Sequence, residues 1–396
     1  MKILNVNFAF DLNFGADRNE FLNMKELQKM GHQVSMVTSD VSSYFTDLKN
    51  KGEKISYDRP INIFDIPVYV LHCTLPQMGV YCPNTNNLAK KIVKEFDVIH
   101  IKNWYDHFAI TFYRAAHKHR IPFAFTSHGT LDPSARNKYK KRVKKLIDLI
   151  YTKKMLKECG AIHASTDSEV TEFQKFGIEQ KKIFRINIGL PQKDFQIKER
   201  TNILDRLGIK KDSPYILFLG RIDPKKGIDL LLKAFSKFSA DFKDIQLVIA
   251  GSGLESYENK IKELTRELGI ENRVKFSGFV LGNEKLQLFE SAKLFALTTY
   301  SDVHPLAVVE SLAMGIPVVI TKFCDFPEIA EFNAGKIVDA DVDSIASAFE
   351  QIMENNQNLK MLSNNAKKLF TERFLFEKEP KEYERLYNYA IKNFNK

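Results

Sequence analysis

Two cations in a short loop are the first residues whose types and spacing suit a chemical role. Residues 220–227 read GRIDPKKG and follow an apolar run that predicts a strand, so Arg221 and Lys226 lie near the start of the next helix. Cations beside free backbone N–H groups at a helix start can hold a phosphate or diphosphate. The alternative is a solvated basic turn, and this loop alone does not exclude it.

Two carboxylates follow another predicted strand, in the stretch TTYSDVHPLAVVESLAMGIPVVIT at residues 298–321. Asp302 and His304 lie in a polar loop, and Pro305 suits the first turn of a helix. Glu310 lies roughly 7 Å farther along that helix at about 1.5 Å per residue, so the two acids cannot form a close pair. They can contact hydroxyl groups on either side of an anion bound at the helix start. The alternative makes Asp302 a helix cap and Glu310 a surface residue.

Two loops that contain glycine offer backbone binding sites. Residues 250–256 read AGSGLES, half of a dinucleotide fingerprint without its third glycine or the acid expected after the next strand. We therefore interpret Gly251 as part of a tight turn that lets a ligand approach the backbone. Residues 13–17 include Gly15 and Ala16 before a predicted helix, and the N–H groups there form a further site for an anion.

One histidine stands at the end of a predicted strand, in the stretch FTSHGTLDP at residues 125–133. At this place the imidazole of His128 can meet a substrate. A lone histidine is more often structural than catalytic, so this loop alone favours the structural interpretation.

The elements that position these loops alternate between short β-branched runs and helical patterns, which is typical of βα units around a parallel sheet. Two such series, separated by a predicted linker at residues 191–200, predict an α/β chain of two doubly wound, Rossmann-like parallel-sheet domains. We expect the first domain at residues 1–193 and the second at 194–378, with a helix at 379–396 that packs back onto the first. The predicted strands are residues 3–8, 33–38, 98–101, 122–127, 161–165 and 183–186, then 215–219, 246–250, 274–277, 294–298, 317–321 and 336–338. The predicted helices include residues 19–30, 227–238 and 306–314.

The composition of the 396 residues, with 44% hydrophobic and 27% charged side chains, excludes global disorder and collagen-like repetition. The cysteines include no CxxC pair, so neither a disulfide scaffold nor a zinc ribbon is supported, and a reducing cytoplasm is the expected location. Neither a secretory signal nor a membrane-spanning helix is predicted. The four cysteines are Cys73, Cys82, Cys159 and Cys324.

The net charge of +10 is concentrated in residues 136–157, where lysine and arginine face only one acid, Asp148. A nucleic-acid partner is not supported, because no zinc finger, RNA-binding aromatic signature or helix-turn-helix spacing accompanies these cations. Two interpretations stay open: a helix that lies on an anionic membrane leaflet, or a solvated helix whose apolar side belongs to the core. The apolar side consists of Val143, Leu146, Ile147, Ile150 and Tyr151.

The motifs in this order resemble those of the GT-B glycosyltransferases, and most closely the retaining family 4 enzymes that use nucleotide sugars. The resemblance covers nearly the whole chain and is most specific in its C-terminal third. It implies two domains that face each other across a cleft and close at the linker. It also implies transfer of a sugar to a saccharide or lipid-linked saccharide acceptor, in polysaccharide or glycoconjugate biosynthesis. The motifs are FGA, SHG, NIGLP at residues 187–191, GRIDPKKG, AGSG, and D-x7-E before SLAMGIPVV.

The resemblance implies roles for individual residues. Arg221 and Lys226 would hold the donor diphosphate, Glu310 would bond the ribose, and Asp302 would contact the hydroxyls of the transferred sugar. Backbone N–H groups around residues 304–306 would support the sugar and the phosphates. The implied catalytic residues are His128, Asp302, Arg221 and Lys226. The implied donor-binding residues are Gly15, Ala16, Gly220, Arg221, Lys226, Gly251, Asp302, His304, Pro305, Leu306 and Glu310.

The resemblance further implies a UDP- or GDP-sugar as co-substrate, retention of the anomeric configuration, and no metal ion or other cofactor. Departures from the family pattern leave other functions open, because D-V-H-P at residues 302–305 replaces the usual E-G-F-G. A catalytically silent subunit that binds nucleotide sugars is one alternative, and a nucleotide-sugar epimerase is another. A nicotinamide dehydrogenase is disfavoured by the broken GxGxxG. The expected location is the cytoplasm, including the inner face of the cell membrane.

Overall fold

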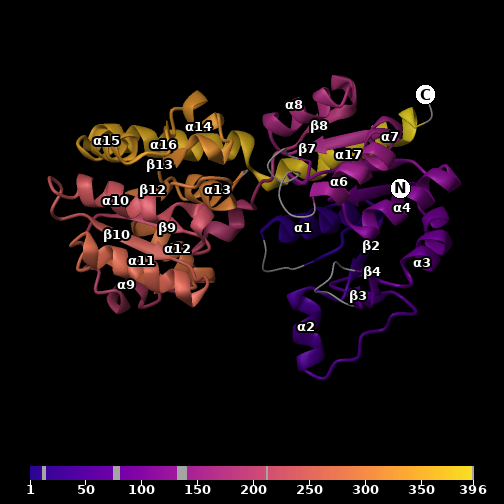
Figure 1. The fold of residues 1–396 in the computed structure, drawn as a ribbon, viewed down its shortest axis with the longest axis horizontal. Coiled ribbons are helices and arrows are strands. Elements are labelled where there is room, and N and C mark those ends of the chain that lie inside the picture. The colour runs from indigo at the N-terminus through magenta and orange to yellow at the C-terminus, as the bar shows by residue number, and fades with distance from the viewer. Residues whose placement is uncertain (11–14, 75–80, 132–140, 211–212, 303, 395–396) are drawn as a thin grey trace. The chain divides into compact units, whose positions relative to one another are not determined.

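The computed structural model describes residues 1–10, 15–74, 81–131, 141–210, 213–302 and 304–394 (Figure 1). The chain forms two compact units, one made of Met1–Ile188 with Glu377–Lys396 and the other of Gly189–Phe376. Each unit contains a parallel sheet covered by helices. The predicted fold class, two doubly wound α/β domains, is therefore confirmed.

The first unit contains an eight-stranded sheet in the order β3-β4-β2-β1-β5-β6-β7-β8. All neighbouring strands are parallel except β3 and β4. The strands are β1 Lys2–Val6, β2 Gln33–Ser39, β3 Ile61–Ile63, β4 Ile66–Leu71, β5 Val98–Lys102, β6 Phe123–Thr126, β7 Ala161–Ala164 and β8 Ile183–Arg185. The helices are α1 Gly15–Lys29, α2 Ser43–Asn50, α3 Thr85–Ile92, η1 Val93–Glu95, α4 His107–His119, α6 Lys141–Ile147, η2 Asp148–Thr152, α7 Lys153–Glu158, α8 Asp167–Lys175, η3 Gln180–Lys182 and α17 Glu379–Asn393.

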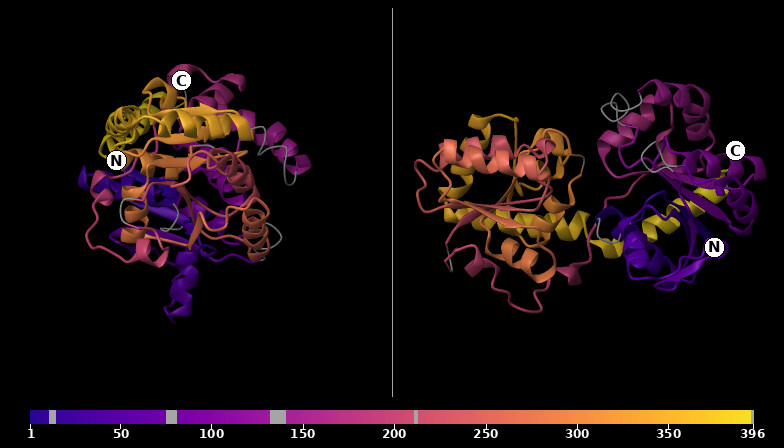
Figure 2. Two further views of the ribbon diagram at one scale, coloured as in Figure 1. Left: turned by 90° about the vertical axis from the view of Figure 1, so that its left-hand side faces the viewer. Right: turned by 60° about the horizontal axis from the view of Figure 1, so that its bottom comes forward.

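The two faces of this sheet carry separate hydrophobic clusters, because successive residues of a strand point to opposite sides. Leu4 and Ile99 face a cluster that includes α4 and α7. Ile3 and Val98 face a second cluster that includes α1 and the C-terminal helix α17. Helix α17 packs against β6 and β7, so the end of the chain belongs to the first unit (Figure 2).

The second unit contains a six-stranded, fully parallel sheet in the order β11-β10-β9-β12-β13-β14. Its strands are β9 Tyr215–Leu219, β10 Gln246–Ala250, β11 Val274–Gly278, β12 Leu294–Leu297, β13 Val318–Thr321 and β14 Gly335–Val338. Its helices are η4 Gln192–Phe195, α9 Ile203–Arg206, η5 Pro224–Lys226, α10 Ile228–Phe238, α11 Glu255–Glu267, α12 Gly282–Ser291, α13 Leu306–Ala313, η6 Lys322–Cys324, α14 Glu328–Glu331, α15 Val342–Met353 and α16 Asn356–Arg373, with η7 Phe376–Lys378 at the crossing between units. Every predicted strand overlaps an observed one.

The predicted linker is wrong. The chain passes between the units at residues 188–189 and again at 376–377, so residues 191–200 belong to the second unit. The ring of Phe195 packs on Phe370, with 5.7 Å between the ring centroids. The N–H of Leu190 donates to the carbonyl of Phe374. These contacts with distant residues hold a segment whose own apolar pattern is too weak to predict structure.

A disulfide joins Cys73 and Cys82, whereas Cys159 and Cys324 are free and buried. The sequence does not predict this pair, because its spacing matches no local motif, and the disulfide removes the cysteine-based reason to expect a reducing compartment. The pair lies at the two ends of a short antiparallel contact between Thr74 and Tyr81.

Candidate functional site

The candidate site of the second unit lies where β9 and β12 run side by side in the middle of the sheet. The chain leaves β9 toward β10 on one side, and it leaves β12 toward β13 on the other. Such a reversal of strand order opens a crevice at the carboxyl ends of the two strands, where α/β proteins bind ligands. The loop at residues 220–227 follows β9, and the loop at 298–305 follows β12. The fold therefore brings the predicted cations and the predicted acids to one end of one sheet.

Hydrogen bonds join these two loops directly. Thr298 Oγ1 donates to the carbonyl of Gly227 at 2.7 Å, and Thr299 Oγ1 donates to the carbonyl of Lys225 at 2.7 Å. The N–H of Tyr300 donates to the same Lys225 carbonyl at 2.8 Å. Gly227 has φ 63°, and a Cβ there would overlap the carbonyl oxygen of Thr298, so only glycine fits.

Lys226 and Asp302 form an ion pair across the joined loops. Both side chains are mostly buried, with 18% and 22% exposed. Asp302 is not the cap of α13, because Pro305 occupies the cap position. Arg221 is exposed and has no ion pair with any residue that the structure describes. Arg221 and Lys226 thus lie in the loop after β9, and Asp302 lies in the adjacent loop after β12.

Glu310 has a partner that the sequence did not predict. Its carboxylate lies 2.7 Å from Nζ of Lys285, a residue of α12. No motif marks Lys285, because only the packing of α12 near α13 brings it to Glu310. Each predicted acid therefore pairs with its own lysine, in agreement with the expectation that Asp302 and Glu310 do not form an acid pair.

His304 is placed differently from its expected use. Its N–H donates to the carbonyl of Cys324 at 3.1 Å, and Pro305 has no N–H, so the backbone donors expected around residues 304–306 reduce to Leu306 and the residues after it. The ring of His304 is 6% exposed and stacks on Phe326 with 4.3 Å between centroids. Its φ of 53° places the backbone in the left-handed region.

The glycines of the 250–256 loop allow two backbones to pack closely. A Cβ at Gly251 would overlap the carbonyl oxygen of Gly220, and a Cβ at Gly253 would overlap that of Ile222. Ile222 and Gly253 also form an isolated parallel bridge. The neighbouring loop of the same chain makes a close approach that needs glycine at residue 251, and a contact of Gly251 with the donor stays a prediction.

In the first unit, the loop that contains His128 is held by a carboxylate that the sequence did not reveal. Glu169, in the first turn of α8, accepts hydrogen bonds from Ser127 Oγ at 2.5 Å, from the N–H of Gly129 at 2.8 Å and from the N–H of Ser165 at 2.7 Å. Two of these donors flank His128, whose φ is 45°. Glu169 therefore fixes the backbone on both sides of a residue in the left-handed region.

The charge states of this loop follow from its surroundings. Burial, together with the charges of Lys102 and His163, keeps the pKa of His128 well below its ordinary value of 6.5, so the ring is neutral at pH 7. Burial raises the pKa of Glu169, but the hydrogen bonds from Ser127, Ser165 and Gly129 outweigh it and lower the pKa below 4.5. Glu169 is therefore an ionised acceptor next to a neutral imidazole.

We expect Glu169→Gln to destabilise the first unit by about 1–3 kcal/mol, because an amide N–H₂ then faces one of three N–H or O–H donors. The lowered pKa adds a pH dependence: the stabilisation by the carboxylate is fully present above pH 4.5 and is lost as the pH falls through the folded-state pKa. Urea unfolding from pH 7 downward measures this difference. Glu172→Gln in the same helix is the control, because the partner of Glu172 is the exposed Lys175 three residues along, and such a pair contributes little. Equal effects of the two substitutions would contradict the assignment.

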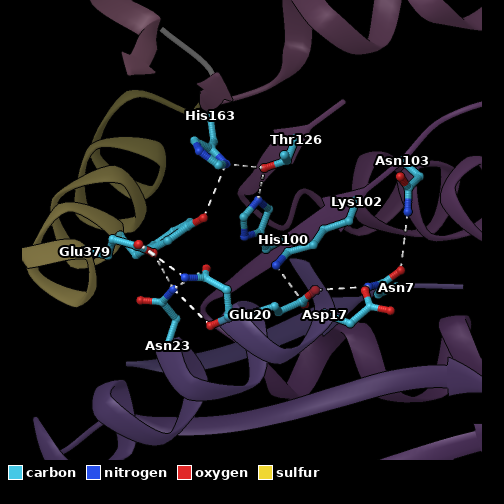
Figure 3. Close-up of polar contacts among 12 residues, drawn as sticks. Asn7, Asp17, Glu20, Asn23, His100, Lys102, Asn103, Thr126, His163 and Glu379 are labelled. Atoms are coloured by element: carbon cyan, nitrogen blue, oxygen red, sulfur yellow. Dashed lines mark hydrogen bonds and ion pairs between the residues drawn. The ribbon is translucent and has the colours of Figure 1, made fainter. Parts of the chain in front are cut away.

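A buried polar network lies at the corresponding strand reversal of the first sheet, between β1 and β5 (Figure 3). Lys102, the last residue of β5, forms a 2.7 Å ion pair with Glu20 of α1, and each side chain is only 5% exposed. Asn7 Nδ2 donates to Glu20 at 3.0 Å and to Asp17 at 3.2 Å. Gly15 begins α1 just before these residues, whereas residues 13 and 14 and the side chain of Ala16 lie outside the described part.

Helix α17 extends this network toward His128. Asn23 and Asn19 of α1 donate to Glu379 at 2.8 Å and 3.2 Å. His100 contacts Tyr387 Oη at 2.9 Å and Thr126 Oγ1 at 2.7 Å. Thr126 in turn contacts His163, whose ring lies 6.5 Å from that of His128 between centroids (Figure 3). In the described part of the chain, no group of three His, Cys, Asp or Glu side chains is arranged to hold a metal ion.

Comparison with known proteins identifies the family. The model for glycosyl transferases group 1 matches residues 199–369, and the model for glycosyltransferase family 4 matches residues 24–191. The two matches fall on the two structural units in turn. The chain belongs to the group 1 glycosyltransferases. The predicted resemblance is confirmed, and the two parallel-sheet units are those of the predicted GT-B fold.

Three proteins illustrate the range of similar glycosyltransferases. An uncharacterized glycosyltransferase of Methanocaldococcus jannaschii is 27% identical over 92% of each chain. The D-inositol 3-phosphate glycosyltransferase of Mycobacterium marinum is 28% identical, over 50% of this chain and 43% of its own length. The solved structure of Anabaena HepE in complex with UDP has a TM-score of 0.75 at 19% identity and covers 97% of this chain and 99% of that one.

Proposed function

We propose that this glycosyltransferase moves a sugar from a UDP- or GDP-sugar to a saccharide or lipid-linked saccharide acceptor, with retention of the anomeric configuration and without a metal ion. The biological setting that we propose is polysaccharide or glycoconjugate biosynthesis. The observation that carries this proposal is the pairing of Lys226 with Asp302 at the strand reversal of the second sheet. The structures of HepE with UDP and with UDP-glucose support the choice of donor class.

The geometry supports a donor that lies along the carboxyl ends of β9 and β12. Arg221 and Lys226 supply two positive charges for the diphosphate, and the first turn of α13 adds the N–H groups of Leu306 and Ala307. When a phosphate oxygen binds Lys226, Asp302 becomes an acceptor for the hydroxyls of the sugar. Glu310 lies farther along α13, where it can accept from the hydroxyls of the ribose.

Charge stabilisation is the main catalytic contribution that these residues can make. The leaving group is a nucleoside diphosphate, and its developing negative charge is stabilised by Arg221, Lys226 and the N-terminal end of the α13 dipole. With these cations in place, the charge of the diphosphate does not need a metal ion. The acceptor attacks on the face that the leaving group departs from, which retains the configuration. His128, as a neutral imidazole, can accept or donate a hydrogen bond to the sugar or the acceptor.

Replacing Glu310 with Gln is expected to weaken UDP binding by roughly tenfold or more, because a charge-assisted hydrogen bond to the ribose is lost. Binding of pyrophosphate, which has no ribose, should change little. Calorimetric titration with both ligands measures the contrast. Glu284→Gln is the control, since Glu284 lies in α12 beside Lys285 and pairs with Arg206 at the surface. Equal losses for UDP and pyrophosphate would exclude the ribose contact.

The proposal is tested by titration with UDP-glucose, GDP-mannose and ADP-glucose, followed by product analysis. We expect one of the first two donors to bind and to release its nucleoside diphosphate in the presence of an acceptor. NMR of the product then gives the anomeric configuration. Binding of none of these donors, or an inverted product, would contradict the proposal.

One observation favours a second candidate, a subunit that binds donor without transferring the sugar. The N–H of His304 is already donated to Cys324, and its ring is packed away on Phe326, so fewer backbone groups remain to support the sugar. Donor binding with neither transfer nor hydrolysis favours this candidate, and an epimerised sugar without acceptor favours an epimerase.

The location that we propose is the cytoplasm, with peripheral attachment to the inner face of the cell membrane. None of the helices in the described part of the chain is long and apolar enough to cross a bilayer. We propose that the basic segment of the first unit provides this attachment, and its described part is residues 141–157.

A further inference from the structure

The helical segment from α6 to α7 of the first unit (Figure 1) has an exposed apolar ridge on one side. The opposite side of this segment is anchored, because Ile147 and Tyr151 pack against the core. Trp104 Nε1 also donates to Thr152 Oγ1 at 2.7 Å, so the segment cannot roll over to bury the ridge. Residues 136–140 lie outside the described part. The ridge consists of Val143, Leu146, Leu149 and Ile150, which are between 50% and 80% exposed.

A cationic cavity of about 570 Å³ adjoins the ridge, and Ile150 belongs to both. Lys90 of α3 and Arg114 and Lys118 of α4 line this cavity, together with Lys154 of α7. The first three have no ion pair with any side chain in the described ranges. Lys154 approaches Glu158 only at 3.8 Å, while Glu158 contacts His117 at 2.9 Å. The cavity therefore keeps an excess of positive charge beside an apolar surface.

We propose that this face binds the anionic phospholipid leaflet, with the ridge at the acyl boundary and a headgroup phosphate in the cationic cavity. A leaflet surface has an apolar acyl layer beneath a layer of anionic headgroups. The exposed aliphatic side chains suit the acyl layer, and the lysines and arginine beside them suit the headgroups. The guanidinium of Arg114 suits a phosphodiester, since it can donate two parallel hydrogen bonds to phosphate oxygens. The inference rests on the proposed function for the peripheral location alone. It does not depend on donor binding, which is assigned to the second unit.

The chemistry of the ridge favours a membrane over the other partners of a basic surface. Single-stranded nucleic acid uses aromatic side chains as stacking platforms between its phosphate contacts. The ridge is aliphatic, and the tyrosines that line the cavity offer no such platform, because Tyr113 is 2% exposed and Tyr151 packs against the core. A free phosphate ion could occupy the cavity, but it would make no apolar contact with Leu146 or Leu149. At a lipid surface both parts find a partner: the ridge contacts acyl chains, and the cationic cavity contacts headgroup phosphates.

The test is sedimentation of the full chain with vesicles of phosphatidylcholine, alone or mixed with phosphatidylglycerol. We expect binding to the mixed vesicles and little to the neutral ones. Leu149→Ser and the double variant Arg114→Gln/Lys118→Gln should each weaken binding by roughly fivefold or more. Two controls make matched changes on the second unit, where the side chains are also exposed: Met361→Ser, and Lys336→Gln/Lys360→Gln, which removes the same net charge. These controls should bind like the wild type.

Three outcomes would overturn the inference. They are equal binding to neutral and mixed vesicles, equal weakening by Lys336→Gln/Lys360→Gln, and binding of inorganic phosphate in calorimetry without any binding to vesicles. The last outcome would show an anion site that does not serve a membrane. Titration with UDP-glucose on the same preparations keeps the donor proposal separate, because a loss of vesicle binding should leave donor affinity unchanged.

Discussion

Lys226→Met is expected to slow sugar transfer by about 10²-fold or more, the effect typical of removing a group that stabilises charge in the transition state. Lys226 is one of the two cations assigned to the diphosphate, and it is the partner of the mostly buried Asp302. Removing it takes away the positive charge and leaves the carboxylate close to a phosphate. The leaving group carries more negative charge in the transition state than in the bound donor. Both changes therefore destabilise the transition state more than the bound donor, and kcat should fall more than donor affinity.

Steady-state rates with the donor that binds, together with calorimetric affinities for UDP, measure this effect. Lys225→Met is the matched control, because Lys225 is the adjacent residue of the same turn and its side chain is exposed, while its backbone carbonyl keeps the loops joined. The control should retain transfer within a few-fold of the wild type. If the two substitutions slow transfer equally, Lys226 does not contact the diphosphate.

Lys102→Met is expected to destabilise the first unit by about 3–5 kcal/mol, because it leaves the buried carboxylate of Glu20 without its counter-charge. Among the residues that the structure describes, the donor that stays with Glu20 is Asn7 Nδ2, which is neutral and does not replace an ammonium group. The double variant Lys102→Met/Glu20→Met should recover much of this loss, since a well-packed apolar pair replaces two buried charges.

Tryptophan fluorescence during urea unfolding measures this loss for the first unit. The chain has a single tryptophan, Trp104, and it is buried in the first unit, so its emission follows this unit. Lys181→Met is the control, because Lys181 and its partner Glu179 are 67% and 63% exposed, and such a pair contributes little. A double variant no more stable than Lys102→Met would show that the ion pair is not the source of the stability.

The parallel strands and the loops after them could be predicted, because their signals are local. A buried parallel strand is a short apolar run, and the loops with Arg221, Asp302 and His128 follow such runs directly. The two strands that the sequence missed, β3 and β4, are joined by a turn at Phe64 and Asp65, both with positive φ. No glycine marks this turn. It is held instead by α1, where Lys25 Nζ donates to the Phe64 carbonyl at 2.7 Å.

The partners of the candidate site residues could not be predicted for the same reason. Lys285 meets Glu310, Glu169 meets Ser127, and Glu20 meets Lys102 across long stretches of sequence. Which pairs form depends on helix packing, which has no local signature. The buried polar network shows this most clearly, because it combines two strand ends, α1 and the C-terminal helix α17.

The structure of the protein with bound UDP-glucose is the measurement that tests the central claim most directly. We expect the diphosphate at the loop of residues 220–227, with phosphate oxygens in hydrogen-bond contact with Arg221 and Lys226. The ribose should lie at Glu310 and the glucose at Asp302. A nucleotide bound elsewhere in the chain, or one whose diphosphate contacts neither Arg221 nor Lys226, would contradict the account.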